Sequence, residues 1–510
     1  MSRSRLLSFF GLGPERAPLL PRGSRRRLQL EPLEDRHLMA VLTIAQENAL
    51  PGAPQSQWDI DGAGSDSIQG YAAQMSVDQG QTVQFKIDTD ASDYRIDIYR
   101  IGYYQGNGAR YITTINPNVS LAQNQPSPFV DYNTGLVDAG NWRVSASWDV
   151  PEDATSGVYI AKLVREDGWF GESHIIFVVR DDDGQSDMLF QTADTTWQAY
   201  NNWGGASLYD STIGPYGRAL EVSYNRPFNT RGTMPINYFF GAEYAMVRYL
   251  ESNGYDVSYT TGIDTDRYGS ELLEHKIFLS VGHDEYWSGD QRENVVAARD
   301  AGVNLAFFSG NEMFWKTRWE NSKAGPSTPY RTMVVYKETL ANAKIDPSGE
   351  WTGTWRDPRF TGDGGQAENA VTGTIFAVNG DGSLGTSIKV SAAEGLLRLW
   401  RNTTVANLSG NQTATLGQYV LGYEWDEDWD NGFRPAGLMR LSTTTVNVSS
   451  YIQDYGSTYA PGTATHHLVM YRAASGALVF GAGTVQWSWG LDGENDLVDV
   501  TPDKAMQQAT

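Results

Sequence analysis

The chain has 510 residues, carries a formal net charge of −22 and contains no cysteine. This length exceeds what one small hydrophobic core needs, so we expect two domains behind an N-terminal leader. The acidic charge excludes nucleic acids and anionic membranes as partners, because both would be repelled. Without cysteine, any bound metal must be held by oxygen or nitrogen ligands. No apolar run reaches the roughly 18 residues of a membrane-spanning helix, so we expect no membrane span.

The N-terminal segment 1–41 is basic, unlike the rest of the chain. Within it, residues 30–40 (Leu-Glu-Pro-Leu-Glu-Asp-Arg-His-Leu-Met-Ala) resemble the leader of planctomycete extracellular proteins. The resemblance implies export to the periplasm or the extracellular space, with His37 as part of the export signal.

From residue 42 to 181, apolar and polar residues alternate in runs separated by Gly, Asp, Asn and Pro turns. The runs lie at 82–88, 94–101, 157–164 and 174–179. A period of two indicates strands with one buried face, so we predict an all-β antiparallel sandwich domain over 42–181. A sandwich of this kind either binds glycan or packs on its neighbour, and the pattern does not distinguish these roles.

A polar run at 180–186 separates this domain from a second one, predicted over 186–500. In its first part, strands alternate with helices, which indicates an α/β catalytic domain with a mostly parallel sheet. The expected strands lie at 188–192, 276–281 and 303–309, and the expected helices at 240–252 and 288–302. The second helix begins with a Ser-x-x-Gln capping box at Ser288. Beyond residue 325 the pattern loosens into strands and long polar loops.

Polar residues follow the predicted strands where each one ends. His283 and Glu285 follow the strand at 276–281, and Asn311 follows the strand at 303–309. Because the carboxyl ends of parallel strands open onto one face of the sheet, we expect these side chains to converge. Residues two apart in an extended chain point the same way, so Asp284 should face away from its two neighbours.

Two of these candidates also have a purely structural interpretation. Glu285 can cap a helix or pair with Arg292, and His283 can satisfy a backbone carbonyl. The residues alone therefore indicate an α/β hydrolytic site with carboxylates, with or without a metal.

The other candidates have structural interpretations too. Tyr200 and Tyr209 are two of 27 tyrosines and can serve packing alone. Asn311 fits a turn position with positive φ. Glu424 stands among acidic neighbours, as a solvated edge would.

Three motifs resemble the catalytic domain in the large subunit of N,N-dimethylformamidase. They are His-Asp-Glu-Tyr-Trp at 283–287, Ser-Gly-Asn-Glu-Met-Phe-Trp at 309–315, and the run from Thr-Trp-Gln-Ala-Tyr to Ser-Leu-Tyr at 196–209. The motifs stand in the family's order, and the resemblance covers roughly residues 185–495. It implies a mononuclear Fe(III) ion held by two tyrosines and one glutamate, with a histidine, an asparagine and a glutamate around them.

Carried over by motif, the resemblance implies that Tyr200, Tyr209 and Glu285 are the metal ligands. The family carries a long insertion between its two tyrosines that this chain lacks. Tyr238 and Tyr244 therefore remain alternatives to Tyr209. Hard anionic oxygen ligands of this kind suit Fe(III) acting as a Lewis acid.

The same transfer implies catalytic roles for His283, Asn311 and Glu424. Asn311 would donate to the oxyanion, and Glu424 or His283 would move protons. The first hypothesis is thus an iron-dependent hydrolase that cleaves an amide or related C–N bond, in which activated water attacks a polarised carbonyl.

Two other hypotheses stay open. One is a glycan-acting enzyme with Glu285 and Glu424 as acid and base. The other is a non-catalytic exported binding protein on the same fold. The substrate is accordingly a small molecule or a glycan, and homo-oligomerisation is left open. The chain departs from the family at Asp284, where the family has Pro, and at Phe314, where it has Tyr, and it shows no sign of the small partner subunit.

Overall fold

The structure is a computed structural model that describes residues 41–510, apart from 121, 229, 232–233, 362–364 and 381–382. The predicted leader lies outside the described residues except for Val41. Within the described part of the chain, no helix combines the length and the apolar character needed to cross a membrane.

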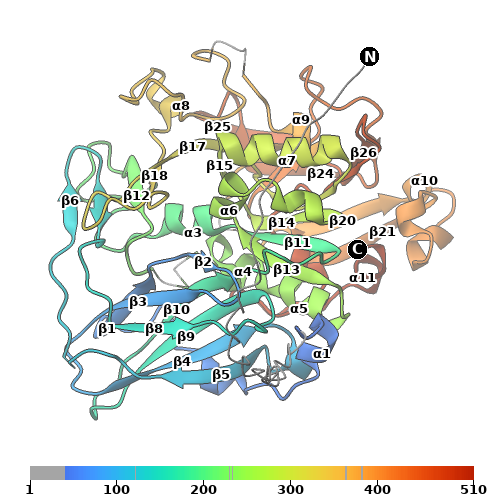
Figure 1. Ribbon diagram of the computed structural model, residues 1–510. Coiled ribbons are helices and arrows are strands. Elements are labelled where there is room, and N and C mark those ends of the chain that lie inside the picture. Colours follow the sequence, from blue (N-terminus) through green and yellow to red (C-terminus); the bar gives the residue numbers. More distant parts are fainter. Residues whose placement is uncertain (1–40, 121, 229, 232–233, 362–364, 381–382) are drawn as a thin grey trace, which may run out of the picture. The chain divides into compact units, whose positions relative to one another are not determined.

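Apart from β6 and β7, the described strands that precede residue 180 form two sheets that share one core (Figure 1). One sheet has the order β1-β3-β8 and the other β2-β10-β9-β4-β5, and every pair except β2–β10 is antiparallel. In the core, the Trp148 ring lies 5.8 Å from Tyr159 and 6.1 Å from Phe177. The strands are β1 (Ile68–Ala72), β2 (Ser76–Val77), β3 (Thr82–Thr89), β4 (Tyr94–Ile101), β5 (Ala109–Ile115), β8 (Ala146–Asp149), β9 (Gly157–Arg165) and β10 (Glu172–Val179).

Short elements complete this part of the chain. The hairpin of β6 and β7 forms a separate two-stranded sheet, and two short helices precede β1. They are α1 (Ile44–Asn48), α2 (Gln55–Trp58), η1 (Tyr104–Gly106), β6 (Phe129–Asp131) and β7 (Leu136–Asp138).

A seven-stranded sheet follows, in the order β13-β11-β14-β16-β27-β26-β23. Its first five strands are parallel, and β26 and β23 are antiparallel to their neighbours. The strands are β11 (Met188–Thr192), β13 (Val257–Thr261), β14 (Ile277–His283), β16 (Asn304–Gly310), β23 (Met439–Arg440), β26 (Val469–Arg472) and β27 (Leu478–Gly481).

Helices connect the parallel strands of this sheet. The predicted capping box at Ser288 is confirmed: its hydroxyl accepts from the Gln291 amide, and α7 ends at Gly302 with φ 111°. The helix expected at 240–252 is interrupted at Glu243 and forms α4 and α5. The helices are α3 (Asp194–Tyr200), α4 (Phe239–Ala242), α5 (Tyr244–Ser252), α6 (Gly262–Arg267), α7 (Gly289–Ala301), and the short η2 (Pro235–Asn237) and η3 (Glu271–Glu274).

The predicted fold class, a mostly parallel α/β catalytic domain, is wrong. Strands hold 33% of the residues and helices 19%, and the chain beyond β16 builds several small sheets with mixed and antiparallel pairing. Parallel neighbours need a long crossover, usually a helix, whereas antiparallel strands need only a short turn. After residue 311 the chain has short connections, such as the six residues between β24 and β25, so antiparallel hairpins form there.

The small sheets have the orders β12-β18-β17-β15, β22-β19-β24-β25 and β20-β21. Their strands are β12 (Glu221–Ser223), β15 (Tyr286–Ser288), β17 (Trp315–Glu320), β18 (Thr332–Val334), β19 (Ile375–Val378), β20 (Thr386–Ser391), β21 (Thr413–Leu421), β22 (Trp425–Glu427), β24 (Thr444–Ile452) and β25 (Tyr459–His466). The remaining helices are α8 (Glu338–Ala341), α9 (Asn369–Thr372), α10 (Ala392–Gly395), η4 (Arg398–Trp400), η5 (Thr404–Asn407), η6 (Trp487–Gly490) and α11 (Lys504–Ala509).

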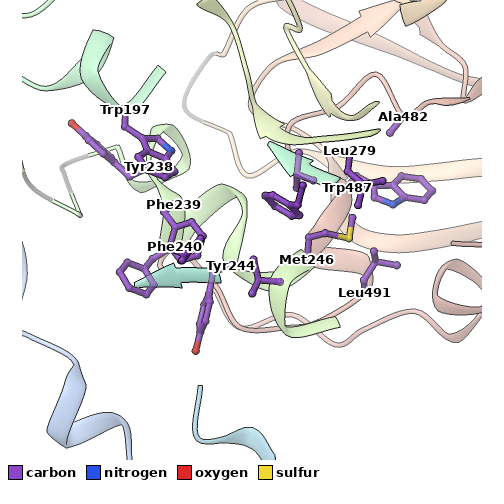
Figure 2. Packing of buried hydrophobic residues seen from close by; sticks show 14 of the residues in the cluster. Trp197, Tyr238, Phe239, Phe240, Tyr244, Met246, Leu279, Ala482, Trp487 and Leu491 are labelled. Atoms are coloured by element: carbon purple, nitrogen blue, oxygen red, sulfur yellow. The ribbon is translucent and has the colours of Figure 1, made fainter. Parts of the chain in front are cut away.

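One large hydrophobic core joins the central sheet to segments far apart in the chain. Figure 2 shows part of it, where aromatic side chains of α3 to α5 pack in a row towards Leu279 of β14 and Trp487 of η6. Trp58, from the chain before the sandwich, stacks on Phe240 with ring centroids 5.9 Å apart. This core supports the strand ends from which the candidate site is built.

Candidate active site

Glu285 meets two tyrosine hydroxyls just beyond the end of β14. The Tyr209 hydroxyl lies 2.6 Å from both carboxylate oxygens of Glu285, and the Tyr200 hydroxyl lies 3.3 Å from Oε2. The two tyrosine rings are stacked with centroids 4.2 Å apart. Tyr209 is 41% exposed, but its hydroxyl end reaches inward to Glu285, which is buried. The three residues predicted as metal ligands are thus brought together.

Backbone contacts hold Glu285 in this position. Its amide donates to the Thr196 hydroxyl of α3. Its carbonyl accepts from the amide of Phe314, in the loop after β16, and from that of Trp315, the first residue of β17. Because Tyr200 ends the helix that contains Thr196, the same contact also fixes the distance between Tyr200 and Glu285. The parallel pairing of β14 with β16, which places His283 beside Gly310, makes these loops neighbours.

His283, Asn311 and Glu424 form a second group behind Glu285. His283 Nε2 lies 3.0 Å from Glu424 and 3.5 Å from Glu285, and Asn311 Nδ2 donates to Glu424 at 2.7 Å. His283 Nδ1 lies 2.8 Å from Asn237 Oδ1, which leaves Nε2 facing the carboxylates. Glu424 is only 4% exposed, so it is not the solvated edge that its acidic neighbours had allowed.

Asn311 is both a turn residue and a member of the site. Its φ of 48° places it in the left-handed region, as a turn residue, and this conformation directs its side chain to Glu424. Its backbone amide donates to Asp426 at 2.9 Å. Its Oδ1 is buried without a partner among the described residues.

The alternatives to Tyr209 lie elsewhere. The Tyr238 hydroxyl donates to the backbone carbonyl of Tyr200, at 3.1 Å. Tyr244 packs among aromatic rings, 5.4 Å from Phe240, and Figure 2 shows both tyrosines within the hydrophobic core. Of the three tyrosines considered for this position, Tyr209 is the one whose hydroxyl contacts Glu285.

Asp284 faces away from the tyrosines, as its place between His283 and Glu285 predicted. Its Oδ2 accepts from Gln191 Nε2 at 2.6 Å and from Ser280 at 3.1 Å, and Ser280 also contacts Glu312 at 3.0 Å. Burial raises the pKa of Asp284 to about 7. Asp284 and Glu312 therefore form a buried acidic pair of their own, on the sheet side of the site.

Burial and neighbouring charge shift the pKa values within the site. Burial, and then the negative charge of Glu285, raise the pKa of the Tyr200 and Tyr209 phenols well above their usual range. Burial also raises the pKa of Glu285. For His283, burial by itself lowers the pKa, but the nearby carboxylates, Glu424 foremost and then Glu285 and Asp284, together outweigh it and the net shift is upward. Burial thus favours the neutral phenols, and the carboxylates favour the charged form of the imidazole.

The sequence did not reveal several residues of the site. The Tyr286 hydroxyl lies 2.6 Å from that of Tyr209, and Lys337 Nζ lies 3.4 Å from the centre of the Tyr209 ring. Burial lowers the pKa of Lys337 to about 7. The one local signal for Lys337 is a lysine directly after the apolar run Met333 to Tyr336, a pattern too common to identify a site.

A cavity of about 310 Å³ opens onto the site. The site residues that line it are Tyr209, Glu285, Asn311 and Glu424. Leu208, Phe314, Trp315 and Phe376 give it apolar walls, and Arg218 and Lys337 add positive charge. A concave apolar cavity with a few convergent polar groups is the usual form of a small-molecule site.

Comparison with known families adds a further observation. Residues 95–500 match the family described as N,N-dimethylformamidase beta subunit-like, C-terminal. The chain belongs to this family. The N,N-dimethylformamidase-like region begins in β4, so it includes most of the sandwich as well as every residue of the candidate site. It extends further towards the N-terminus than the motifs had indicated.

Other comparisons add little to this family assignment. No curated protein matches the chain. One solved structure that matches is the crystal structure of the Paenibacillus sp. cycloisomaltooligosaccharide glucanotransferase complexed with cycloisomaltoheptaose, at 8% identity and a TM-score of 0.16. The match covers 47% of this chain and 44% of that one, so the chain spans less than half of that protein. A TM-score this low supports no functional parallel.

Proposed function

We propose that this N,N-dimethylformamidase-like protein is an iron-dependent hydrolase that cleaves an amide or related C–N bond. The observation that carries the proposal is the convergence of the Tyr200, Tyr209 and Glu285 oxygens beside a cavity. Membership of the family supports a hydrolase of this kind.

The three oxygen donors fit a mononuclear Fe(III) ion. Two phenolates and a carboxylate are hard, anionic ligands, which suit a small cation of high charge. Among the described residues, no group of three or more His, Asp or Glu side chains could hold a metal by itself, so the tyrosines are essential to the proposed ligand set. Burial disfavours the charged form of a phenol and so keeps it protonated. A trivalent cation beside the phenol removes this penalty, because its positive charge stabilises the phenolate.

When bound, the iron supplies a Lewis acid that polarises the substrate carbonyl and acidifies water. The residues of the chain orient the reactants around it. Asn311 Nδ2 donates to Glu424 and fixes the direction of that carboxylate, while its unpaired Oδ1 offers an acceptor to an N–H or a water molecule in the cavity.

Hydrolysis adds water across the C–N bond: a C–O bond forms, the C–N bond breaks, and the leaving nitrogen takes up a proton. Glu424 Oε2 and His283 Nε2 lie 3.0 Å apart, and Glu424 lines the cavity. This pair accepts the proton of the attacking water and returns one to the leaving nitrogen. The products are a carboxylic acid and an amine.

The test is to purify the full chain after iron-replete expression and to measure its iron content and visible spectrum. Tyrosinate bound to Fe(III) gives a coloured charge-transfer band, which should weaken in Tyr200→Phe and disappear with the iron in Glu285→Ala. Tyr132→Phe, at a position that is 70% exposed, is the matched control and should keep the full band.

A colourless, iron-free wild-type protein would overturn the metal assignment. For the reaction, amine release is measured on a panel of N-alkyl formamides and acetamides. An iron-loaded protein that hydrolyses none of them would overturn the hydrolase assignment.

A further inference from the structure

Two cationic side chains line the active-site cavity without an acidic partner. Arg218 and Lys337 share this cavity with Glu285 and Asn311. Neither forms a salt bridge with an Asp or Glu side chain in the described parts of the chain. A cation away from bulk water is normally paired, and an arginine does not lose its charge as a buried lysine can, so the unpaired Arg218 in this cavity requires an explanation.

The guanidinium of Arg218 is only partly satisfied. Its Nη2 donates to the Tyr336 carbonyl at the long distance of 3.4 Å, and its Cζ lies 5.5 Å from the centre of the Tyr216 ring. Its Nε is buried without an acceptor among the described residues. Arginine stays charged throughout the physiological pH range and binds carboxylates with two parallel hydrogen bonds. Arg218 thus lines the cavity with a guanidinium that is only partly hydrogen-bonded.

Lys337 is held in place by the backbone. It is 1% exposed and has a φ of 49°, a conformation that a lysine adopts at a cost and that tends to occur at functional sites. Its Nζ lies 3.4 Å from the Tyr209 ring centre and 4.8 Å from that of Trp315. Lys337 therefore brings a second basic group to the cavity that Arg218 lines.

The carboxylates of the cavity act on Lys337 but leave Arg218 without an acidic partner among the described residues. Glu285 attracts Lys337, whereas Glu424 is paired with His283 and Asn311. The positive charge of Arg218 is thus left for a ligand.

We propose that Arg218, assisted by Lys337, binds an anionic group of the substrate. The substrate is then an amide that carries a carboxylate at the end away from the scissile C–N bond, joined to it by a short carbon chain. The apolar walls at Leu208, Phe314 and Phe376 suit such a chain, and a cavity of about 310 Å³ holds more than a small neutral formamide. The part of this inference that concerns cleavage of the amide rests on the proposed function. The part that concerns binding of the anion does not.

The first experiment compares two substrates, N-formyl-4-aminobutanoate and N-butylformamide, by formate release from the iron-loaded full chain. They share the formamide and the carbon chain, and only one carries the carboxylate. We expect kcat/KM to favour the anionic substrate by at least about tenfold, and Arg218→Met to reduce that ratio to near one. Arg218→Lys keeps the charge but loses the two parallel N–H donors of the guanidinium, so it should give an intermediate ratio. Arg398→Met, an exposed position outside the cavity, should leave both rates unchanged.

The second experiment measures binding without turnover. Pentanoate is titrated calorimetrically into the wild type, Arg218→Met, and the iron-free Glu285→Ala variant. Binding that is retained in Glu285→Ala and at least about tenfold weaker in Arg218→Met supports the inference. Binding that disappears in Glu285→Ala but survives in Arg218→Met would mean that the carboxylate binds the metal, and would overturn it.

The two proposals fail in different ways. If both formamides are hydrolysed equally and Arg218→Met does not alter the ratio, the anion site is wrong and the hydrolase stands. If neither formamide is hydrolysed but pentanoate binds through Arg218, the hydrolase is wrong and the anion site stands.

Discussion

Arg100 and Arg218 are both shielded from bulk water, but they differ in how completely the protein pairs their guanidinium groups. Arg100, in β4, is fully buried, and its guanidinium donates to both carboxylate oxygens of Glu251 in α5 at 2.8 and 2.9 Å. It also donates to the Tyr104 hydroxyl and the Ser156 carbonyl. Within the described part of the chain, Arg218 has one long hydrogen bond and its Nε has no acceptor. The first arginine joins the sandwich to α5. The second lines a cavity, and its guanidinium is not fully hydrogen-bonded.

The difference follows from the cost of burying a charge. In the interior, an unpaired ion is strongly unfavourable, so an arginine with a structural role is paired with a carboxylate of the protein. A half-buried arginine at a cavity wall can remain incompletely paired in the free protein, because a bound ligand supplies the missing hydrogen-bond acceptors. Three further variants test how far this distinction extends.

The largest effect is expected for Arg100→Met, which leaves the Glu251 carboxylate buried without its cation. We expect the free energy of unfolding to fall by about 3–5 kcal/mol, measured by urea denaturation. In the double variant Arg100→Met/Glu251→Met both charges are removed, so much of that loss should be recovered. A fall below about 1 kcal/mol in the single variant would contradict the view of this pair as a structural link.

The second prediction concerns Asp194, a buried acid near the site that has no cationic partner among the described residues. It accepts from the Tyr224 hydroxyl at 2.8 Å and from the Gly262 amide at 2.6 Å, and burial raises its pKa to about 7. Because the folded-state pKa lies above the ordinary value of 3.8, its protonated form stabilises the fold at low pH. That stability should be lost as the pH rises from about 4 to 7, at up to about 1.4 kcal/mol for each pH unit.

The measurement is the melting temperature of Asp194→Asn between pH 5 and pH 8. Its decline with rising pH should be shallower than that of the wild type, since the amide does not ionise. Asp300→Asn, in which a 58% exposed side chain is replaced, is the control and should follow the wild-type curve. Equal slopes for Asp194→Asn and the wild type would show that Asp194 is already ionised in the folded protein at pH 5.

The smallest effect is expected at Arg95, which shares β4 with Arg100. Its contact with Glu166, at 2.6 Å, has side-chain exposures of 36% and 41%. Because water screens an exposed pair, Glu166→Gln should change the free energy of unfolding by no more than about 1 kcal/mol. A loss comparable to that of Arg100→Met would mean that burial does not separate the two arginines.

Local signals in the sequence were sufficient for individual elements and for part of the site. The strand before His283, the capping box at Ser288 and the stop of α7 at Gly302 depend on neighbouring residues, and the structure contains them. The grouping of His283 with Glu285, and the opposite direction of Asp284, followed from the period of an extended chain. Such features can be predicted because each is determined within a few residues.

The tertiary structure alone decided the architecture and the composition of the cavity. Whether strands pair in parallel or antiparallel depends on the connections between them, and after residue 311 this produced several small sheets in place of one mostly parallel sheet. Glu424 lies 113 residues from Asn311 in sequence but 2.7 Å away in space. Arg218 and Lys337 share the cavity although no motif links them. Their positions depend on long-range packing, which no local pattern in the sequence encodes.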